Sequence, residues 1–225
     1  MNQTTIKQRA VQPNQKQARR QVILDVALAL FQTSSYEAVS MAAVADAAGV
    51  AKGTVYLYFK TKEELFLALQ TQAFEAWFGA VDDSLYATPG PLAVQQFVQI
   101  IDNALAANPQ LVRLIAILHT TLEQNIDFAA ALVFKQMLAE HVRQTGALLE
   151  SRLPFLGAGA GAQLLLRLHA LVIGLQHMAE PAPVVAQVLN EQPDLAFFQI
   201  NFHEQFRVTL QTFLSGLAAQ SRGEG

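Results

Sequence analysis

Apolar positions recur at helical spacing along most of this chain, and no stretch alternates apolar and polar residues like a strand. Residues 15–33 carry an apolar stripe at Val22, Ile23, Val26, Ala27, Leu30 and Phe31. The same spacing predicts further helices at 41–48, 51–58, 61 onward, 91–108, 109–122, 128–152, 162–178, 184–190 and 194–218. The sequence therefore predicts an all-α protein.

Capping residues mark the ends of several of these helices. Ser40 is the expected N-cap of the short helix 41–48, and Gly49 ends that helix. Thr61, with Glu64 three residues later, predicts a capping box at the start of a long helix. Two short helices joined by a glycine turn, behind a longer helix, predict a helix-turn-helix.

Charge is distributed unevenly along the chain. Residues 1–62 carry eight Lys or Arg against three acids, whereas residues 63–225 carry seven against fifteen. A basic first part on an acidic body favours contact with a polyanion. A solvated basic tail is the alternative, and charge alone does not choose between the two.

Composition excludes several classes of protein. The 225 residues include no cysteine, so a disulfide or a thiolate metal site is excluded. No signal-peptide pattern and no uncharged apolar run long enough for a membrane span occur, which predicts a cytoplasmic protein with no membrane partner. No nucleophile, base and acid lie at local spacing, so we expect no enzyme, no cofactor and no metal.

The helix predicted at 51–58 has the chemistry of a DNA-recognition helix. Lys52 and Thr54 lie in its first turn, where free N–H groups and the helix dipole favour anions. Tyr56 lies four residues after Lys52, and Tyr58 lies four residues after Thr54, so each pair shares one face of the helix. Gly53 lets the backbone approach a duplex closely. Each residue alone is also explained by a solvated lysine or a core tyrosine, but together within a basic segment they favour DNA.

Residues 18–69 resemble the DNA-binding domain of the tetracycline-repressor-like (TetR) family of bacterial transcription regulators. The matching residues are "ILDVALALF", Tyr36 and "SMAAVADAAGVAKGTVYLYFKTKEEL", with Met41 where the family usually has threonine. The resemblance implies phosphate contacts from Ser40, Thr54, Tyr56, Tyr58 and Lys62. It also implies base contacts from Ala51, Lys52 and Gly53, and backbone or minor-groove contacts from an arm with Lys16, Arg19 and Arg20.

The resemblance also implies an architecture of two domains. Residues 1–62 would form the basic arm and a three-helix DNA-binding domain, with a long linking helix from about 61. Residues 63–225 would form an all-helical domain for effector binding and dimerisation. The implied partners are a pseudo-palindromic double-stranded operator, a second copy of the chain and an unidentified small-molecule effector.

A dimer surface is predicted on the helices at 162–178 and 194–218. The first is apolar nearly all round, and a helix apolar on all sides is buried on all sides. The second carries phenylalanines at helical spacing. The residues expected at the interface are Ala170, Leu171, Gly174, Phe202, Phe206 and Phe213. The alternative is a seam inside a single protomer.

Polar residues among the apolar helices are candidate ligand contacts. They are Arg113, His119, His141, Arg167, His169 and His177. Arg167 lies within a leucine run, so it needs a partner, either an anionic effector or a carboxylate of the protein. His119 and Glu123 are four residues apart and are interpreted as a surface pair, since no third metal ligand is in register.

Three functions fit these patterns. The leading hypothesis is a homodimeric repressor released from its operator by a small molecule. The second is a DNA-binding regulator whose C-terminal body only dimerises. The third is a helical enzyme or small-molecule carrier, which leaves the charge distribution unexplained.

Overall fold

The protein is helical throughout the part that the structure describes. The computed structural model describes residues 4–223, with side chains placed for 15–221, and confirms the all-α prediction. The chain forms two compact units. The boundary between them follows Leu69, within the long helix α4 (Lys62–Ala87). None of the described helices is long and apolar enough to cross a bilayer.

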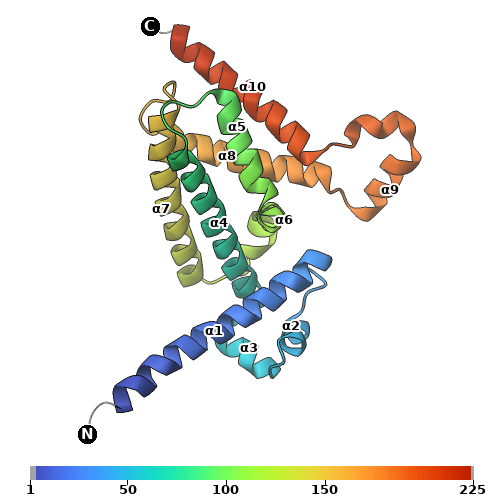
Figure 1. The fold of residues 1–225 in the computed structure, drawn as a ribbon. Helices are drawn as coiled ribbons and strands as arrows, with labels where there is room; N and C mark the ends of the chain where they lie inside the picture. The colour runs from blue at the N-terminus through green and yellow to red at the C-terminus, as the bar shows by residue number, and fades with distance from the viewer. Residues whose placement is uncertain (1–3, 224–225) are drawn as a thin grey trace. The chain divides into compact units, whose positions relative to one another are not determined.

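The first unit contains α1 (Thr4–Thr33), α2 (Met41–Ala47), α3 (Lys52–Tyr58) and the start of α4 (Figure 1). On α1, Ile23, Leu24, Ala27 and Phe31 are buried. The buried face therefore differs from the predicted stripe: Val22, which was expected to be buried, is 47% exposed, and Leu24 is fully buried instead. Both residues flank the line of Ile23 and Ala27, so packing against the neighbouring elements decides which of the two is buried.

Aromatic contacts tie the start of α4 to the first unit. The Phe66 ring meets Phe31 edge-on, with centroids 5.3 Å apart, and Tyr36 with centroids 4.8 Å apart. Val55 of α3 and Phe59 complete this apolar interior. Edge-to-face pairs add stability beyond the area that they bury.

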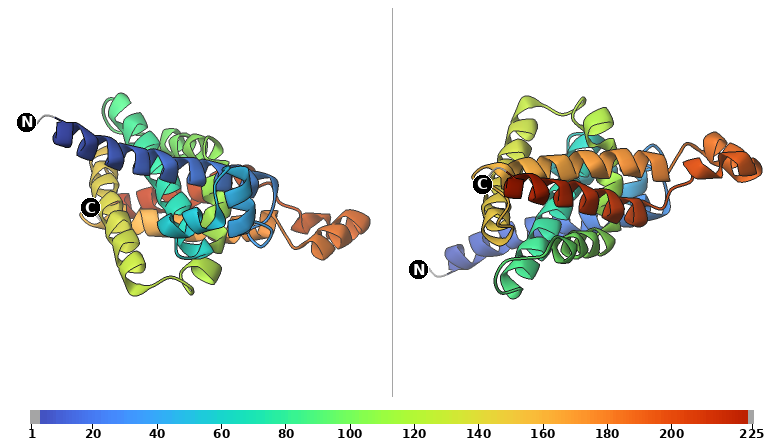
Figure 2. Two further views of the ribbon diagram at one scale, coloured as in Figure 1. Left: turned by 90° about the horizontal axis from the view of Figure 1, so that it is seen from below. Right: turned by 90° about the horizontal axis from the view of Figure 1, so that it is seen from above.

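The second unit contains the rest of α4 and the later helices. These are α5 (Val94–Ala106), α6 (Pro109–Ile117), the π-helical turn η1 (Leu118–Leu122), α7 (Phe128–Arg152), α8 (Ala160–Ala179), α9 (Pro183–Glu191), the 3₁₀ helix η2 (Pro193–Phe198) and α10 (Phe202–Gly223). Within this unit, α8 packs against α6, α7 and α10, and α10 also packs against α5 (Figure 2).

Two of the predicted helices are divided in the structure. The helix expected over 109–122 becomes α6 and the π-helical turn η1. The helix expected over 194–218 becomes η2 and α10, with a break at 199–201. Asn201 explains the new start, because its side-chain oxygen accepts a hydrogen bond from the Glu204 N–H at 3.0 Å.

Helices α7 and α8 cross closely at Gly146 and Gly161. A Cβ atom added to Gly161 would lie 2.0 Å from the Gly146 carbonyl oxygen. The Gly161 N–H donates to a Glu150 carboxylate oxygen at 2.9 Å, which fixes the start of α8 on α7. Glycine at these two positions is therefore a packing requirement.

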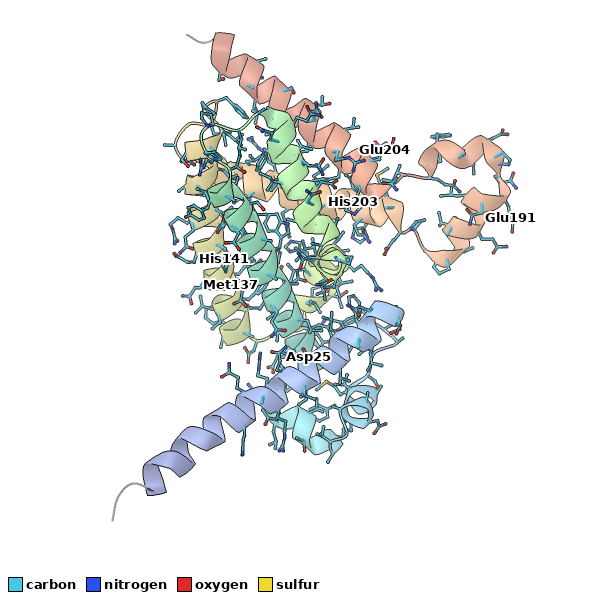
Figure 3. All side chains as sticks on the ribbon, in the orientation of Figure 1. Asp25, Met137, His141, Glu191, His203 and Glu204 are labelled. Carbon is cyan, nitrogen blue, oxygen red and sulfur yellow. The ribbon has the colours of Figure 1, made fainter. Side chains whose placement is uncertain are left out.

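A buried carboxylate fixes α10 to α5. Asp102 is 4% exposed and accepts hydrogen bonds from His203 Nδ1 at 2.6 Å and from Arg207 at 3.0 Å. His203 lies at the start of α10 (Figure 3). By contrast, α9 and η2 contain no buried residue and project from the rest of the unit (Figure 1). Phe197 on this projection is 72% exposed.

Candidate DNA-binding surface and ligand cavity

A short glycine turn sets the angle between α2 and α3. Gly49 has a φ of +65°, a conformation that residues with a Cβ rarely adopt. The Val50 N–H donates to the Ala45 carbonyl at 3.0 Å and closes the turn. Ser40 caps α2 as predicted, since its hydroxyl accepts from the Ala43 N–H at 3.1 Å. The local geometry is that of a helix-turn-helix.

Most of the predicted DNA contacts lie on the accessible side of α3. Ala51, Lys52, Gly53 and Tyr56 are exposed, and Thr54 and Tyr58 are half-buried. The Lys52 ammonium lies 6.0 Å from the Tyr56 ring centroid, as their spacing predicts. Leu57, which the sequence analysis did not single out, is 80% exposed on α3. An exposed leucine on a recognition helix suits contact with a thymine methyl group.

Lys62 makes contacts within the first unit. Its ammonium donates to the Tyr36 carbonyl and lies 3.9 Å from the Tyr36 ring centroid. Burial lowers the pKa of this lysine, and the nearby Glu37 and Glu63 oppose that shift. Because an ammonium has three donors, the Tyr36 contact leaves donors for a phosphate.

The basic residues of α1 differ in their surroundings. Arg20 is half-buried, with its guanidinium 5.0 Å from the centroid of the Phe59 ring, just past the end of α3. Arg19 and Lys16 are exposed. Ser40 is also exposed, so its hydroxyl can accept from Ala43 and still donate.

The second unit contains an apolar cavity of about 390 Å³, within the range of small-molecule sites. Side chains from α4, α5, α6, α7, α8 and α10 line it. They include Phe74, Trp77, Phe78, Ile101, Leu105, Leu111, Ile115, Leu138, Val142, Leu165, Val172 and Phe206. His119, Lys135 and His169 also line the cavity.

These three residues and Glu123 form one hydrogen-bonded chain, here named the polar cluster. Lys135 Nζ donates to Glu123 Oε1 at 2.5 Å, and Glu123 Oε2 pairs with His119 Nδ1 at 2.8 Å. His119 Nε2 lies 3.1 Å from His169 Nε2. The predicted His119–Glu123 pair is thus confirmed and extends to two further helices. No group of metal ligands occurs among the described residues.

The electrostatics of the polar cluster follow from burial and charge. Burial lowers the pKa of His169 to about 4, and the charges of His119 and Lys135 act in the same direction. Burial alone would raise the pKa of Glu123, but hydrogen bonds from Lys135 and His119 hold it below its usual value. Glu123 is therefore an anion and His169 is neutral at neutral pH.

Of the six predicted ligand contacts, two line the cavity: His119 and His169. His141 stacks on Phe78 with ring centroids 4.9 Å apart, while Arg113 and His177 lie away from the lining. Arg167 was expected to need an anionic partner because it lies within a leucine run. This expectation was wrong, since Arg167 is exposed, with its guanidinium 5.5 Å from the centroid of the Phe213 ring. Lys135 was missed, since nothing in the sequence near it marks a cavity.

The predicted dimer residues fall into two groups. Ala170, Gly174 and Phe213 are exposed, and Leu171 and Phe202 are half-buried. A Cβ on Gly174 would meet nothing within 4 Å, so its surface is open in the protomer. Phe206 is a correction, because it is fully buried in the protomer and lines the cavity.

An exposed, partly basic recognition helix and a separate helical unit with a cavity define a DNA-binding regulator. Family models agree over both units. Residues 23–69 match the model described as "Bacterial regulatory proteins, tetR family", and residues 71–221 match "Tetracyclin repressor-like, C-terminal domain". The chain belongs to the TetR family, and it is a DNA-binding transcriptional regulator.

Curated relatives match over part of the chain. The transcriptional repressor KstR of Mycobacterium tuberculosis is 38% identical over 94 residues, which cover 41% of this chain and 43% of that protein. The transcriptional regulator AcrR of Shigella flexneri is 48% identical over 50 residues, 22% of this chain and 23% of that protein. The chain thus spans less than half the length of these relatives.

Solved structures share the fold over most of the chain. PfmR of Thermus thermophilus has a TM-score of 0.55 and 18% identity over 86% of this chain and 97% of its own. FadR of Bacillus halodurans has a TM-score of 0.55 and 20% identity over 88% of this chain and 96% of its own. At these identities the likeness shows the fold alone.

Proposed function

We propose that this regulator is a homodimeric repressor released from a pseudo-palindromic operator by a small molecule. The observation that carries this proposal is the apolar cavity with a single polar cluster in the second unit. A core that only held a dimer together would be expected to fill such a space, because empty volume destabilises a protein. The name of KstR as a repressor supports the direction of regulation.

The dimer is proposed to form through the exposed sides of α8 and α10. Val208 on α10 is 58% exposed, and a Cβ on Gly174 of α8 would meet nothing within 4 Å. One short recognition helix reads few bases, and two-fold pairing doubles the site that is read. The α9–η2 projection also carries exposed apolar residues, Phe197 and Val184.

Release by a ligand follows from thermodynamic linkage. A ligand that favours one arrangement of the dimer weakens DNA binding only if DNA favours another, and DNA then weakens the ligand by the same factor. A coupling of about 1–3 kcal/mol is typical, and it changes operator affinity by roughly 5- to 150-fold.

The test begins with an operator selected from genomic DNA by the purified protein. Compounds that raise its thermal stability are then titrated into the protein–operator complex and followed by fluorescence anisotropy. We expect a stabilising compound to release the operator, and Val142→Trp, which fills the cavity, to keep DNA binding and lose the response. A protein that binds its operator but answers to no compound would favour a regulator whose body only dimerises.

A further inference from the structure

The polar cluster is built from three separate elements at the wall of the cavity. His119 comes from η1, Lys135 from α7 and His169 from α8, and Glu123 joins Lys135 to His119. The π-helical turn places His119 at the lining, and such turns are frequent at functional sites. Around the rest of the cavity the lining side chains are almost entirely aliphatic or aromatic.

From this arrangement we infer that the effector is an amphipathic monocarboxylate. Its apolar body fills the cavity, and its carboxylate binds Lys135 and the His119–His169 pair. This inference rests on the proposed function and names the chemical class of ligand for that cavity.

The donors in the polar cluster favour an anion. Lys135 has three N–H donors and uses one on Glu123, and the side chains of Lys135 and His119 are 53% and 46% exposed. Both are therefore within reach of an entering group. A cationic head would meet an ammonium and two imidazoles, with Glu123 as the single acid in the cluster. A carboxylate forms charge-assisted hydrogen bonds with the same donors.

Glu123 makes, within the protein, the contacts that a ligand carboxylate would make. Its two oxygens hold Lys135 and His119, which are the groups that the ligand must engage. A ligand carboxylate therefore competes with Glu123 for these donors. Removing the negative charge of Glu123 frees them, so it strengthens the binding of an acid and leaves a neutral ligand of equal size unaffected.

The experiment measures the binding of decanoate, decanol and methyl decanoate to the full chain by calorimetry. Carboxylates from hexanoate to hexadecanoate are added to find the best chain length. We expect the acid to bind about tenfold or more tightly than the alcohol or the ester, the size of effect that a charged hydrogen bond gives.

Two variants and one control make the test specific. Lys135→Met should reduce the affinity for the acid to that for the alcohol, and Glu123→Gln should raise the affinity for the acid several-fold. Arg143→Met is the control, because Arg143 lies on the same helix, pairs with Glu140 and does not line the cavity. Circular dichroism confirms that each variant folds.

Equal affinities for the three probes, no binding of any acid in the series, or weaker acid binding by Glu123→Gln would overturn the inference. Failure of the proposed function has a different signature. In that case decanoate binds with the expected dependence on Lys135 and Glu123, yet the operator complex is unchanged in anisotropy.

Discussion

At the scale of single residues, Lys52 on α3 and Lys62 at the start of α4 are expected to act differently. Lys62→Ala should weaken binding to all sequences about equally and lower the salt slope by about one unit, because we propose that Lys62 contacts one phosphate. Lys52→Ala should change which sequences are preferred, because we propose that Lys52 contacts base edges. Salt-dependent anisotropy and a selection on random DNA measure the two effects. An unchanged selected motif for Lys52→Ala would make Lys52 a phosphate contact instead.

Gly53 provides a second test of the recognition helix. A Cβ on this glycine meets nothing within 4 Å in the protein, so Gly53→Leu should fold. It should nevertheless abolish operator binding, because the added side chain occupies the space of the duplex. Gly79→Leu is the matched control, since Gly79 is an exposed helical glycine of α4 with equally open surroundings. Operator binding by Gly53→Leu at parental strength would place the DNA elsewhere.

His169 makes stability depend on acid pH. Its pKa falls from 6.5 to about 4 in the folded state, so the unfolded chain binds the proton more readily. Its contribution to stability is fully present above pH 6.5 and is lost as the pH falls toward 4. The free energy of unfolding should fall by up to about 1.4 kcal/mol per pH unit in that window. Denaturant unfolding at several pH values measures this slope.

His169→Gln should show a smaller slope between pH 6.5 and 4, because it removes the titrating group and keeps a hydrogen-bonding side chain. His177→Gln, on the exposed surface of the same helix, is the control. A slope that His169→Gln leaves untouched would assign the acid sensitivity to other groups.

At the scale of elements, the crossing of α7 and α8 depends on two glycines. Gly161→Ala would place a methyl group 2.0 Å from the Gly146 oxygen, so the helices must separate. We expect a loss of about 1–3 kcal/mol in the free energy of unfolding. Gly79→Ala should instead gain about 0.5–1 kcal/mol, because an open helical glycine is replaced by alanine. Urea denaturation distinguishes the two, and a neutral Gly161→Ala would contradict the close crossing.

Local signals explain which elements the sequence could predict. Ser40, Gly49 and the start of α7 at Asp127–Phe128 have caps or turns formed by neighbours in the chain. The Thr61–Glu64 box is half as expected: the Glu64 N–H donates to Thr61 Oγ1 at 3.1 Å, but the Glu64 carboxylate accepts from the Lys60 N–H. Such features need no knowledge of the tertiary fold.

The cavity depends on contacts that the sequence does not display. His119 and His169 are fifty positions apart and meet only after α6 and α8 have packed. Arg167 and His169 are two residues apart on one helix, yet the first faces outward and the second lines the cavity. Periodicity predicts that α8 is helical, but the neighbouring helices decide which of its polar residues reaches a ligand.

At the scale of the whole molecule, the proposed dimer can be broken at one position. Gly174→Glu should place an unpaired charge in the interface, and the variant should sediment as a monomer with greatly reduced operator affinity. The open space around Gly174 means that the protomer itself should fold normally. Analytical ultracentrifugation and circular dichroism check both points. A variant that sediments as an intact dimer would move Gly174 out of the interface.

The π-helical turn at Leu118–Leu122 also has an evolutionary consequence. Such a turn holds one residue more than an α-helical turn, and each residue advances a helix by about 100°. Deleting Thr120 would restore the α-helical register and change the position of Glu123 relative to His119, so the hydrogen bonds of the polar cluster would rearrange. A single inserted or deleted codon can thus remodel the wall of the cavity while the sequence of the helix-turn-helix stays the same.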